Sequence, residues 1–264
     1  FSPGCRTPAP RDESPHVVRA GQPWDTRLLE LDSDDERRIE AHARFAAGGI
    51  DELDDAPENA LSHFLAAVEK DPENENLTLD VARKLIARRR LEDARQLLDR
   101  SAQRPGATGL VWGWLGTVLS LQGNPAAAVR AHEEAVRRSP GNVRSYQALA
   151  QAHLDAGAPA AAVKVLEDAA ARPDADGSFL LFVAESLTVV GQRKEAGIED
   201  PGSRVMALLN RVEAMKLERP ADLVRLADLY QAQGESEKAL TIYQGLLERD
   251  PDLPGLRERL TGIY

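Results

Sequence analysis

Small and large apolar residues recur along the chain at a spacing of 34 residues. Four such series run in parallel, and each keeps one kind of residue. They are Ala60, Ala94, Ala128, Ala162 and Ala196; Gly48, Ala82, Gly116, Ala150 and Ala184; Ala47, Val81, Leu115, Leu149 and Val183; and Gly123, Gly157 and Gly191. A single shift of nine residues after Ala196 continues all four as Ala239, Ala227, Leu226 and Gly234. The pattern predicts a tandem structural repeat.

Each period predicts two helices joined by a short turn. In the unit over residues 109–142, apolar residues at three- and four-residue spacing share one helical face, made of Trp112, Leu115, Gly116 and Leu119. The turn Gly123-Asn124-Pro125 ends this helix. A second helix then carries Ala128, His132 and Ala135. Because one helix pair leaves its outer apolar face uncovered, successive pairs are expected to stack into an all-α solenoid.

These positions resemble the tetratricopeptide repeat (TPR) family. The unit already described matches it at Trp112-x2-Leu115-Gly116-x2-Leu119, then at Ala128, His132, Ala135 and Pro140. The last unit matches at Leu223, Leu226, Ala227, Tyr230, Gly234, Ala239, Tyr243 and Pro251. The resemblance covers about residues 41–253. It implies a right-handed superhelix of antiparallel helix pairs, whose concave face binds a peptide or a partner helix.

Two units depart from the family pattern. The second has Thr78 where the family prefers a large apolar residue, and Gly106 where it prefers proline. Residues 197–202 interrupt the fifth unit, as a protruding contact loop or as a tolerated surface insertion. A helix is expected to restart near Ser203, which can cap it, and to run to about Glu218.

The chain is therefore divided into a Pro-rich tether and a solenoid. The tether, residues 1–32, has many prolines and few large apolar side chains, which disfavours a packed structure. The solenoid, residues 33–264, has repeats expected near 41–74, 75–108, 109–142, 143–176, 177–219 (with the insertion) and 220–253, and a terminal helix over 254–264. Its first helix is expected to be long, with Ser33 and Glu36 as a capping box, and to run towards Leu53.

The net charge and the lengths of the apolar runs argue against several classes of partner. The 264 residues include 33 Lys and Arg against 43 Asp and Glu, a net charge of −10. This argues against a nucleic-acid partner, which normally meets a basic face, and against attraction to anionic lipid. No apolar run approaches the roughly 20 residues that span a membrane.

Cys5 is the only cysteine, so neither an internal disulfide nor a cysteine zinc site is possible. Its place after Gly4 and before a Pro-rich polar stretch resembles the acylated cysteine of bacterial lipoproteins, although Ser2 and Pro3 fit that signal poorly. This interpretation predicts lipid attachment at Cys5 and a place in the cell envelope. The alternative is an incidental thiol in a cytoplasmic protein.

No arrangement of residues predicts catalysis. None of the five histidines lies in an HExxH pattern or beside the cysteine, and no phosphate-binding glycine loop is present. His132 and His153 occupy repeat positions that normally pack between helices. The sequence therefore predicts a non-enzymatic protein without a metal ion or a small-molecule cofactor.

The resemblance places the binding surface on the first helix of each pair. Helical phase then predicts the side chains that face the groove, among them Phe45, Asn76, Leu79, Arg83, Arg144, Gln147, Gln151 and Glu185. The two arginines can hold a carboxylate with paired donors, while apolar contacts are expected to supply most of the affinity.

The leading hypothesis is a non-catalytic scaffold that binds another protein or a peptide in this groove. In its more specific form the scaffold is a lipid-anchored assembly factor of the bacterial envelope. The alternative is the repeat module of a larger enzyme, such as a glycosyltransferase, with its catalytic domain beyond Tyr264. A third hypothesis is self-association through the ends of the repeat array.

Overall fold

The computed structural model describes residues 32–193 and 200–262, and within these ranges it is built from α-helices and turns, without a strand. The helices are α1 (Ser33–Leu53), α2 (Pro57–Lys70), α3 (Glu75–Ala87), α4 (Leu91–Ala102), α5 (Gly109–Leu121), α6 (Pro125–Arg138), α7 (Val143–Asp155), α8 (Pro159–Ala170), α9 (Gly177–Gly191), α10 (Pro201–Glu213), α11 (Pro220–Ala232), α12 (Ser236–Arg249) and α13 (Leu256–Thr261).

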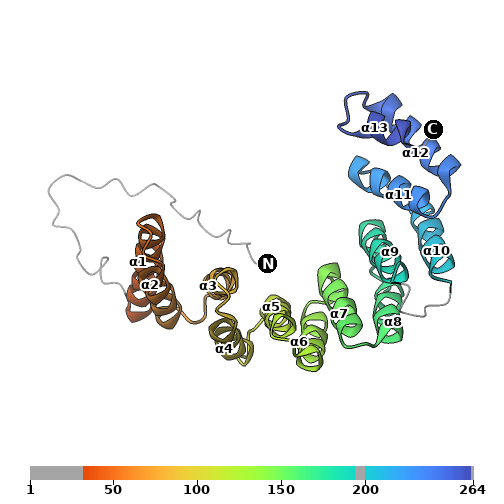
Figure 1. The fold of residues 1–264 in the computed structure, drawn as a ribbon. Coiled ribbons are helices and arrows are strands. Elements are labelled where there is room, and N and C mark those ends of the chain that lie inside the picture. Colours follow the sequence, from red (N-terminus) through yellow and green to blue (C-terminus); the bar gives the residue numbers. More distant parts are fainter. Residues whose placement is uncertain (1–31, 194–199, 263–264) are drawn as a thin grey trace, which may run out of the picture.

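The helices pack as consecutive pairs, from α1 with α2 to α11 with α12, and the pairs follow one another along an arc (Figure 1). The first helices of neighbouring pairs also contact each other, as α3 with α5, α5 with α7, α7 with α9 and α9 with α11. From α3 to α10 the odd-numbered helices lie on the inner side of the arc and the even-numbered helices on the outer side (Figure 1). The predicted all-α solenoid is confirmed.

Local sequence explains where most of these helices start and stop. Proline, which suits the first helical turn, begins five of them, at Pro57, Pro125, Pro159, Pro201 and Pro220. Glycine with a positive φ follows the end of three first helices, at Gly123 (75°), Gly157 (72°) and Gly234 (85°). These three glycines of the series therefore form left-handed turns.

Gly191 belongs to the same glycine series for a different reason. It lies in the last turn of α9, and a Cβ atom placed on it would come within 2.5 Å of the Cβ atom of Pro201. Glycine there allows the start of α10 to approach the end of α9 after the insertion.

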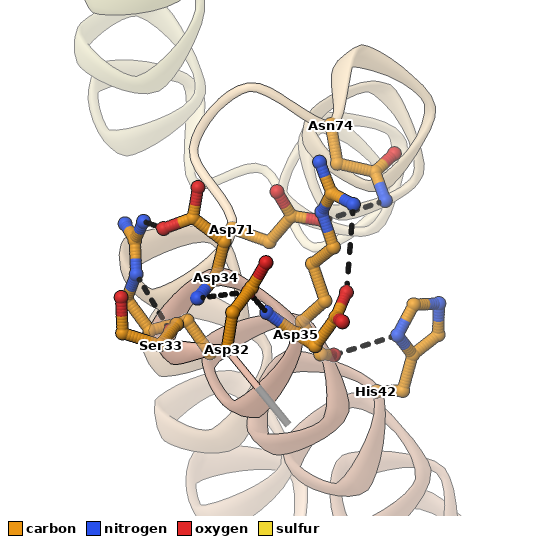
Figure 2. Close-up of polar contacts among 9 residues, drawn as sticks. Asp32, Ser33, Asp34, Asp35, His42, Asp71 and Asn74 are labelled. Atoms are coloured by element: carbon orange, nitrogen blue, oxygen red, sulfur yellow. Dashed lines mark hydrogen bonds and ion pairs between the residues drawn. The ribbon is translucent and has the colours of Figure 1, made fainter. Parts of the chain in front are cut away.

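Two helix caps differ from the prediction. Asp32, not Ser33, caps α1: its carboxylate accepts from the backbone amides of Asp34 and Asp35, each at 2.8 Å (Figure 2). Asp200, not Ser203, caps α10, and its Oδ1 accepts from the Ser203 amide at 3.1 Å. In both places an aspartate stands just before the first helical turn, where a carboxylate reaches the free amides. α10 also ends at Glu213, earlier than the expected Glu218.

The core falls into two clusters of buried side chains. One runs from Ala60 to Ala131 and joins α2–α6, and the other runs from Tyr146 to Leu256 and joins α7–α13. At the C-terminal end, α13 buries Leu256 against the last pair. At the N-terminal end, α1 leaves three large apolar side chains exposed, those of Ile39, Ile50 and Leu53.

Several features of the sequence lie outside the described residues. They include residues 1–31 of the tether, with Cys5, and residues 194–199, which hold part of the insertion. In the part of the chain that the structure describes, no helix combines the length and the hydropathy needed to cross a bilayer.

Candidate functional site

A hollow of about 470 Å³ opens between α7 and α9. It brings together Gln147, Gln151 and Glu185, three of the residues predicted to face the groove. Its lining is Gln147, Ala148, Ala150, Gln151, Leu154, Glu185, Ser186, Val189 and Val190. Both helices are first helices of their pairs and lie on the inner side of the arc (Figure 1).

Gln147 links the two walls of the hollow. Its Nε2 donates to Ser186 Oγ at 2.9 Å, and Ser186 Oγ donates to the Phe182 carbonyl oxygen at 2.8 Å. The start of α7 sets this register, because the Asn142 side chain accepts from the Arg144 amide and fixes the first turn. Gln147 is thus held in place across the gap between α7 and α9.

Gln151 follows one turn later, at the exposed rim. Its Nε2 donates to Asp155 Oδ1 at 2.5 Å, and its Oε1 accepts from Arg193 Nη2 at 3.0 Å. Both ends of the amide are therefore oriented by neighbouring charged groups.

Glu185 extends the site towards α11. Its Oε1 lies 2.7 Å from Arg225 Nε, and the Arg225 guanidinium lies 4.0 Å from the centroid of the Phe182 ring. Burial raises the pKa of Glu185 above its usual value; Arg225 opposes this shift, and the nearby Asp228 carboxylate adds to it. The carboxylate and the guanidinium thus form a partly buried ion pair stacked on an aromatic face.

Val189 lines the hollow, although the sequence analysis did not select it. Its side chain is 55% exposed and supplies apolar surface at the hollow. The sequence gives no clear signal for it, because α9 also contains neighbouring apolar residues that are both buried, such as Leu180 and Leu181. The structure buries Val190 and leaves Val189 open.

The other predicted groove residues are spread over α1, α3 and the start of α7. Arg144 is exposed one turn before Gln147, with no ion pair among the described residues. Asn76 is exposed on α3, and Arg83 pairs with Asp80 of the same helix. The ring of Phe45 is half-buried against that of Phe64, with 5.1 Å between the ring centroids.

The prediction for Leu79 is wrong. This side chain is only 7% exposed and belongs to the core cluster of α2–α6. α3 packs against α2, α4 and α5, and Leu79 is part of the buried cluster that these helices share.

Among the described residues, no group of three or more His, Cys, Asp or Glu side chains is arranged to hold a metal ion. His132 is 3% exposed, and a Cβ atom on Gly116 would lie 2.6 Å from its Nε2. Burial lowers the pKa of His132 to about 4, so the ring is neutral at pH 7 and packs as a core residue.

The sequence matches the tetratricopeptide repeat family over residues 53–106 and 119–180, and a second model with the same description over residues 223–256. No curated protein matches it. The similar solved structures include a thermophilic TPR protein from Thermus thermophilus, with 22% identity, a TM-score of 0.43, and 72% of this chain and 98% of that chain covered.

They also include pilF from Pseudomonas aeruginosa, with 16% identity, a TM-score of 0.46, and 86% of this chain and 99% of that chain covered. A third is YrrB, described as a TPR protein with an unusual peptide-binding site, with 17% identity, a TM-score of 0.40, and 75% of this chain and 97% of that chain covered. With the family matches spread from the first helix pair to the last, the chain belongs to the tetratricopeptide repeat family.

Proposed function

We propose that this protein is an interaction scaffold that holds a peptide segment of a partner protein in the hollow between α7 and α9. The observation that carries the proposal is a single hollow lined by Gln147, Gln151, Glu185 and the exposed Val189. Glu185 is held there by its ion pair with Arg225 of α11. Membership of the TPR family supports a role in protein interaction in general.

The lining favours a ligand of defined chemistry. Val189, Leu154 and Ala148 offer apolar contact to one side chain of the ligand. Each glutamine Nε2 uses one N–H within the protein, and its second N–H can donate to a carbonyl oxygen of a peptide backbone. Arg144, one turn away on α7, can pair with a carboxylate. We therefore expect a peptide with an apolar side chain next to an acidic residue.

The Glu185–Arg225 pair fits this expectation. Because the Arg225 guanidinium already accompanies the Glu185 carboxylate at 2.7 Å, this carboxylate is not an uncompensated negative charge facing an acidic peptide. Glu185 instead fixes Arg225 over Phe182 and so closes the α11 side of the site.

Selection from a displayed library of random peptides tests this proposal. The wild-type chain alone is used for selection, and the Val189→Asp variant is kept for the affinity measurement. A selected peptide is then titrated against the 15N-labelled chain. We expect amide shifts centred on residues 147–154 and 185–190, whereas peptides that shift only other regions would overturn the proposal.

The Val189→Asp change needs a control of the same chemistry outside the hollow. Met215 is 41% exposed, follows α10 and does not line the hollow. Met215→Asp removes a similar amount of exposed apolar surface and adds the same charge. It should leave peptide binding unchanged.

Lipid anchorage at Cys5 is a separate part of the proposal, supported by the sequence Gly4-Cys5 and the prolines that follow. An acylated Cys5 would tether the scaffold at the bacterial envelope. Intact-mass spectrometry of the protein purified from membranes tests this, with Cys5→Ala as the control. A mass without an acyl group would contradict the anchor.

A further inference from the structure

A comparison of equivalent positions in three successive repeat units points to a second site. Arginine recurs at 34-residue spacing at or just after the end of the second helix of three successive units, at Arg104, Arg138 and Arg172. The first helices of the same units carry Thr78, Trp112 and Tyr146, also 34 residues apart. Each arginine thus has a counterpart at one fixed position of its own unit.

In two of these units the arginine contacts the aromatic residue of its own unit. The Arg138 guanidinium lies 5.5 Å from the centroid of the Trp112 ring. In the next unit, Arg172 Nη1 donates to the Tyr146 hydroxyl at 3.1 Å, and Arg172 also lies 5.9 Å from the centroid of the Phe179 ring. In both units an aromatic side chain therefore occupies this position and contacts the arginine.

The second unit lacks the aromatic side chain and has a pocket instead. Thr78 stands at the aromatic position, and a pocket of about 210 Å³ opens beside it between α2 and α4. Its lining is Leu65, Val68, Glu69, Pro72, Thr78, Leu97, Arg100, Ser101 and Arg104. Thr78 is 1% exposed, and its hydroxyl has no hydrogen-bond partner among the described residues. A buried hydroxyl left without a partner is costly unless a ligand satisfies it.

We propose that this pocket binds an aromatic side chain of a partner protein, in the place that Trp112 and Tyr146 occupy in the following units. The floor is apolar, with Leu65, Val68 and Leu97, and Arg104 stands at the position from which Arg138 covers Trp112. A cavity of about 150 Å³ already admits benzene. The negative face of an aromatic ring also complements the guanidinium groups of Arg104 and Arg100.

The surroundings leave room for the backbone that carries such a side chain. A neighbouring hollow of about 610 Å³ shares Pro72, Ser101 and Arg104 with the pocket and continues along residues 105–107. It includes Gly106, the position where the sequence departs from the proline of the family. The pocket lies between second helices, on the outer side of the arc, whereas the hollow between α7 and α9 lies between first helices. The two sites can therefore hold different segments at the same time.

Titration of the full chain with N-acetyltryptophanamide tests the proposal by 15N–1H NMR. We expect saturable shifts at the amides of Thr78, Leu97 and Ser101, and weaker shifts with N-acetylleucinamide. The Val189→Asp variant should respond as the wild type does, which separates this site from the proposed groove. Absence of shifts at the pocket, or equal shifts with both compounds, would overturn the proposal.

Two variants examine the geometry. Thr78→Trp supplies the missing ring from the chain itself, so it should abolish binding of the probe and raise the melting temperature. Arg104→Gln removes the cation from an accessible side chain without touching the floor, and we expect affinity to fall by about threefold at unchanged helical content. If Thr78→Trp does not fold, Arg104→Gln alone tests the proposal. An unchanged affinity of Arg104→Gln for the probe would contradict it.

The chain's own Trp24 is the competing occupant. If the probe binds only after Trp24→Ala, the pocket serves this chain's own tryptophan, and the assignment to a partner protein is overturned. Equal binding by the wild type and by Trp24→Ala supports a partner.

Discussion

Gly48 and Gly49 are neighbours on α1 that the same substitution should affect in opposite directions. A Cβ atom on Gly48 would lie 2.9 Å from the Ala60 carbonyl oxygen and 2.7 Å from the Phe64 ring, whereas one on Gly49 would meet nothing within 4 Å. The close approach of α2 thus requires glycine only at Gly48.

We predict that Gly48→Ala lowers the free energy of unfolding by about 1–3 kcal/mol, because the backbone of α2 must move. Gly49→Ala should raise it by about 0.5–1 kcal/mol through helix propensity. Urea unfolding of both variants measures the difference. Two changes of the same sign would contradict the packing described here.

His132 should make stability depend on pH. Burial holds its folded-state pKa at about 4, below the ordinary value of 6.5. The unfolded chain therefore binds the proton first, and stability that is present above pH 6.5 is lost as the pH falls towards 4. The loss attributable to this one ring is on the order of 3 kcal/mol.

The variant His132→Leu removes the titrating group from a buried position. The free energy of unfolding, measured at pH 7 and pH 4.5 in both proteins, should fall more for the wild type than for the variant. Carboxylates that titrate in the same range cancel in this comparison. Equal pH dependence of the two proteins would show that the ring is accessible to protons in the folded state.

At the scale of the element, the cap of α1 can be checked directly. The Asp32 carboxylate accepts from two backbone amides, while Ser33 is already the first helical residue. Asp32→Ala should therefore speed hydrogen exchange at the amides of Asp34 and Asp35. Ser33→Ala should not, and the reverse result would restore the capping box that the sequence suggested.

The sequence predicts the class of these elements well and their exact phase less well. Periodicity identified the all-α solenoid, because small residues such as Gly116 and Ala128 mark where helices touch. It failed at Leu79, where the helical projection put on the surface a side chain that belongs to the buried cluster of α2–α6. A projection of one helix contains no information on how that helix is rotated against its neighbours.

The sequence predicts the candidate site only in part, because helical phase does not describe how neighbouring units stack. Gln147, Gln151 and Glu185 were selected by phase and line one hollow, but Val189 was missed. Its exposure depends on the separation between α7 and α9, which is a property of stacking between units. The pocket beside Thr78 was visible in the sequence only as a departure from the family pattern.

At the scale of the whole molecule, the core is divided into two clusters. A mutation in one cluster should therefore destabilise mainly the half of the solenoid that contains it. Leu98 lies in the cluster of α2–α6 and Leu209 in that of α7–α13, and both side chains are fully buried. Each leucine-to-alanine change should cost about 2–5 kcal/mol. Because repeat units contact mainly their neighbours, the loss should stay in the mutated half.

Hydrogen exchange monitored by mass spectrometry reads out both halves in one experiment. Leu98→Ala should lower protection mainly over residues 57–138, and Leu209→Ala mainly over residues 143–261. A uniform loss across the chain in either variant would mean that the solenoid unfolds as a single cooperative unit.

The most direct test of the central claim is the affinity of one selected peptide for three proteins, measured by isothermal titration calorimetry. They are the wild type, Val189→Asp in the hollow between α7 and α9, and Met215→Asp outside it. We predict that Val189→Asp weakens binding by about tenfold or more, ~1.4 kcal/mol, whereas Met215→Asp leaves it unchanged. Equal affinity for Val189→Asp and the wild type would contradict the assignment of this hollow as the binding site.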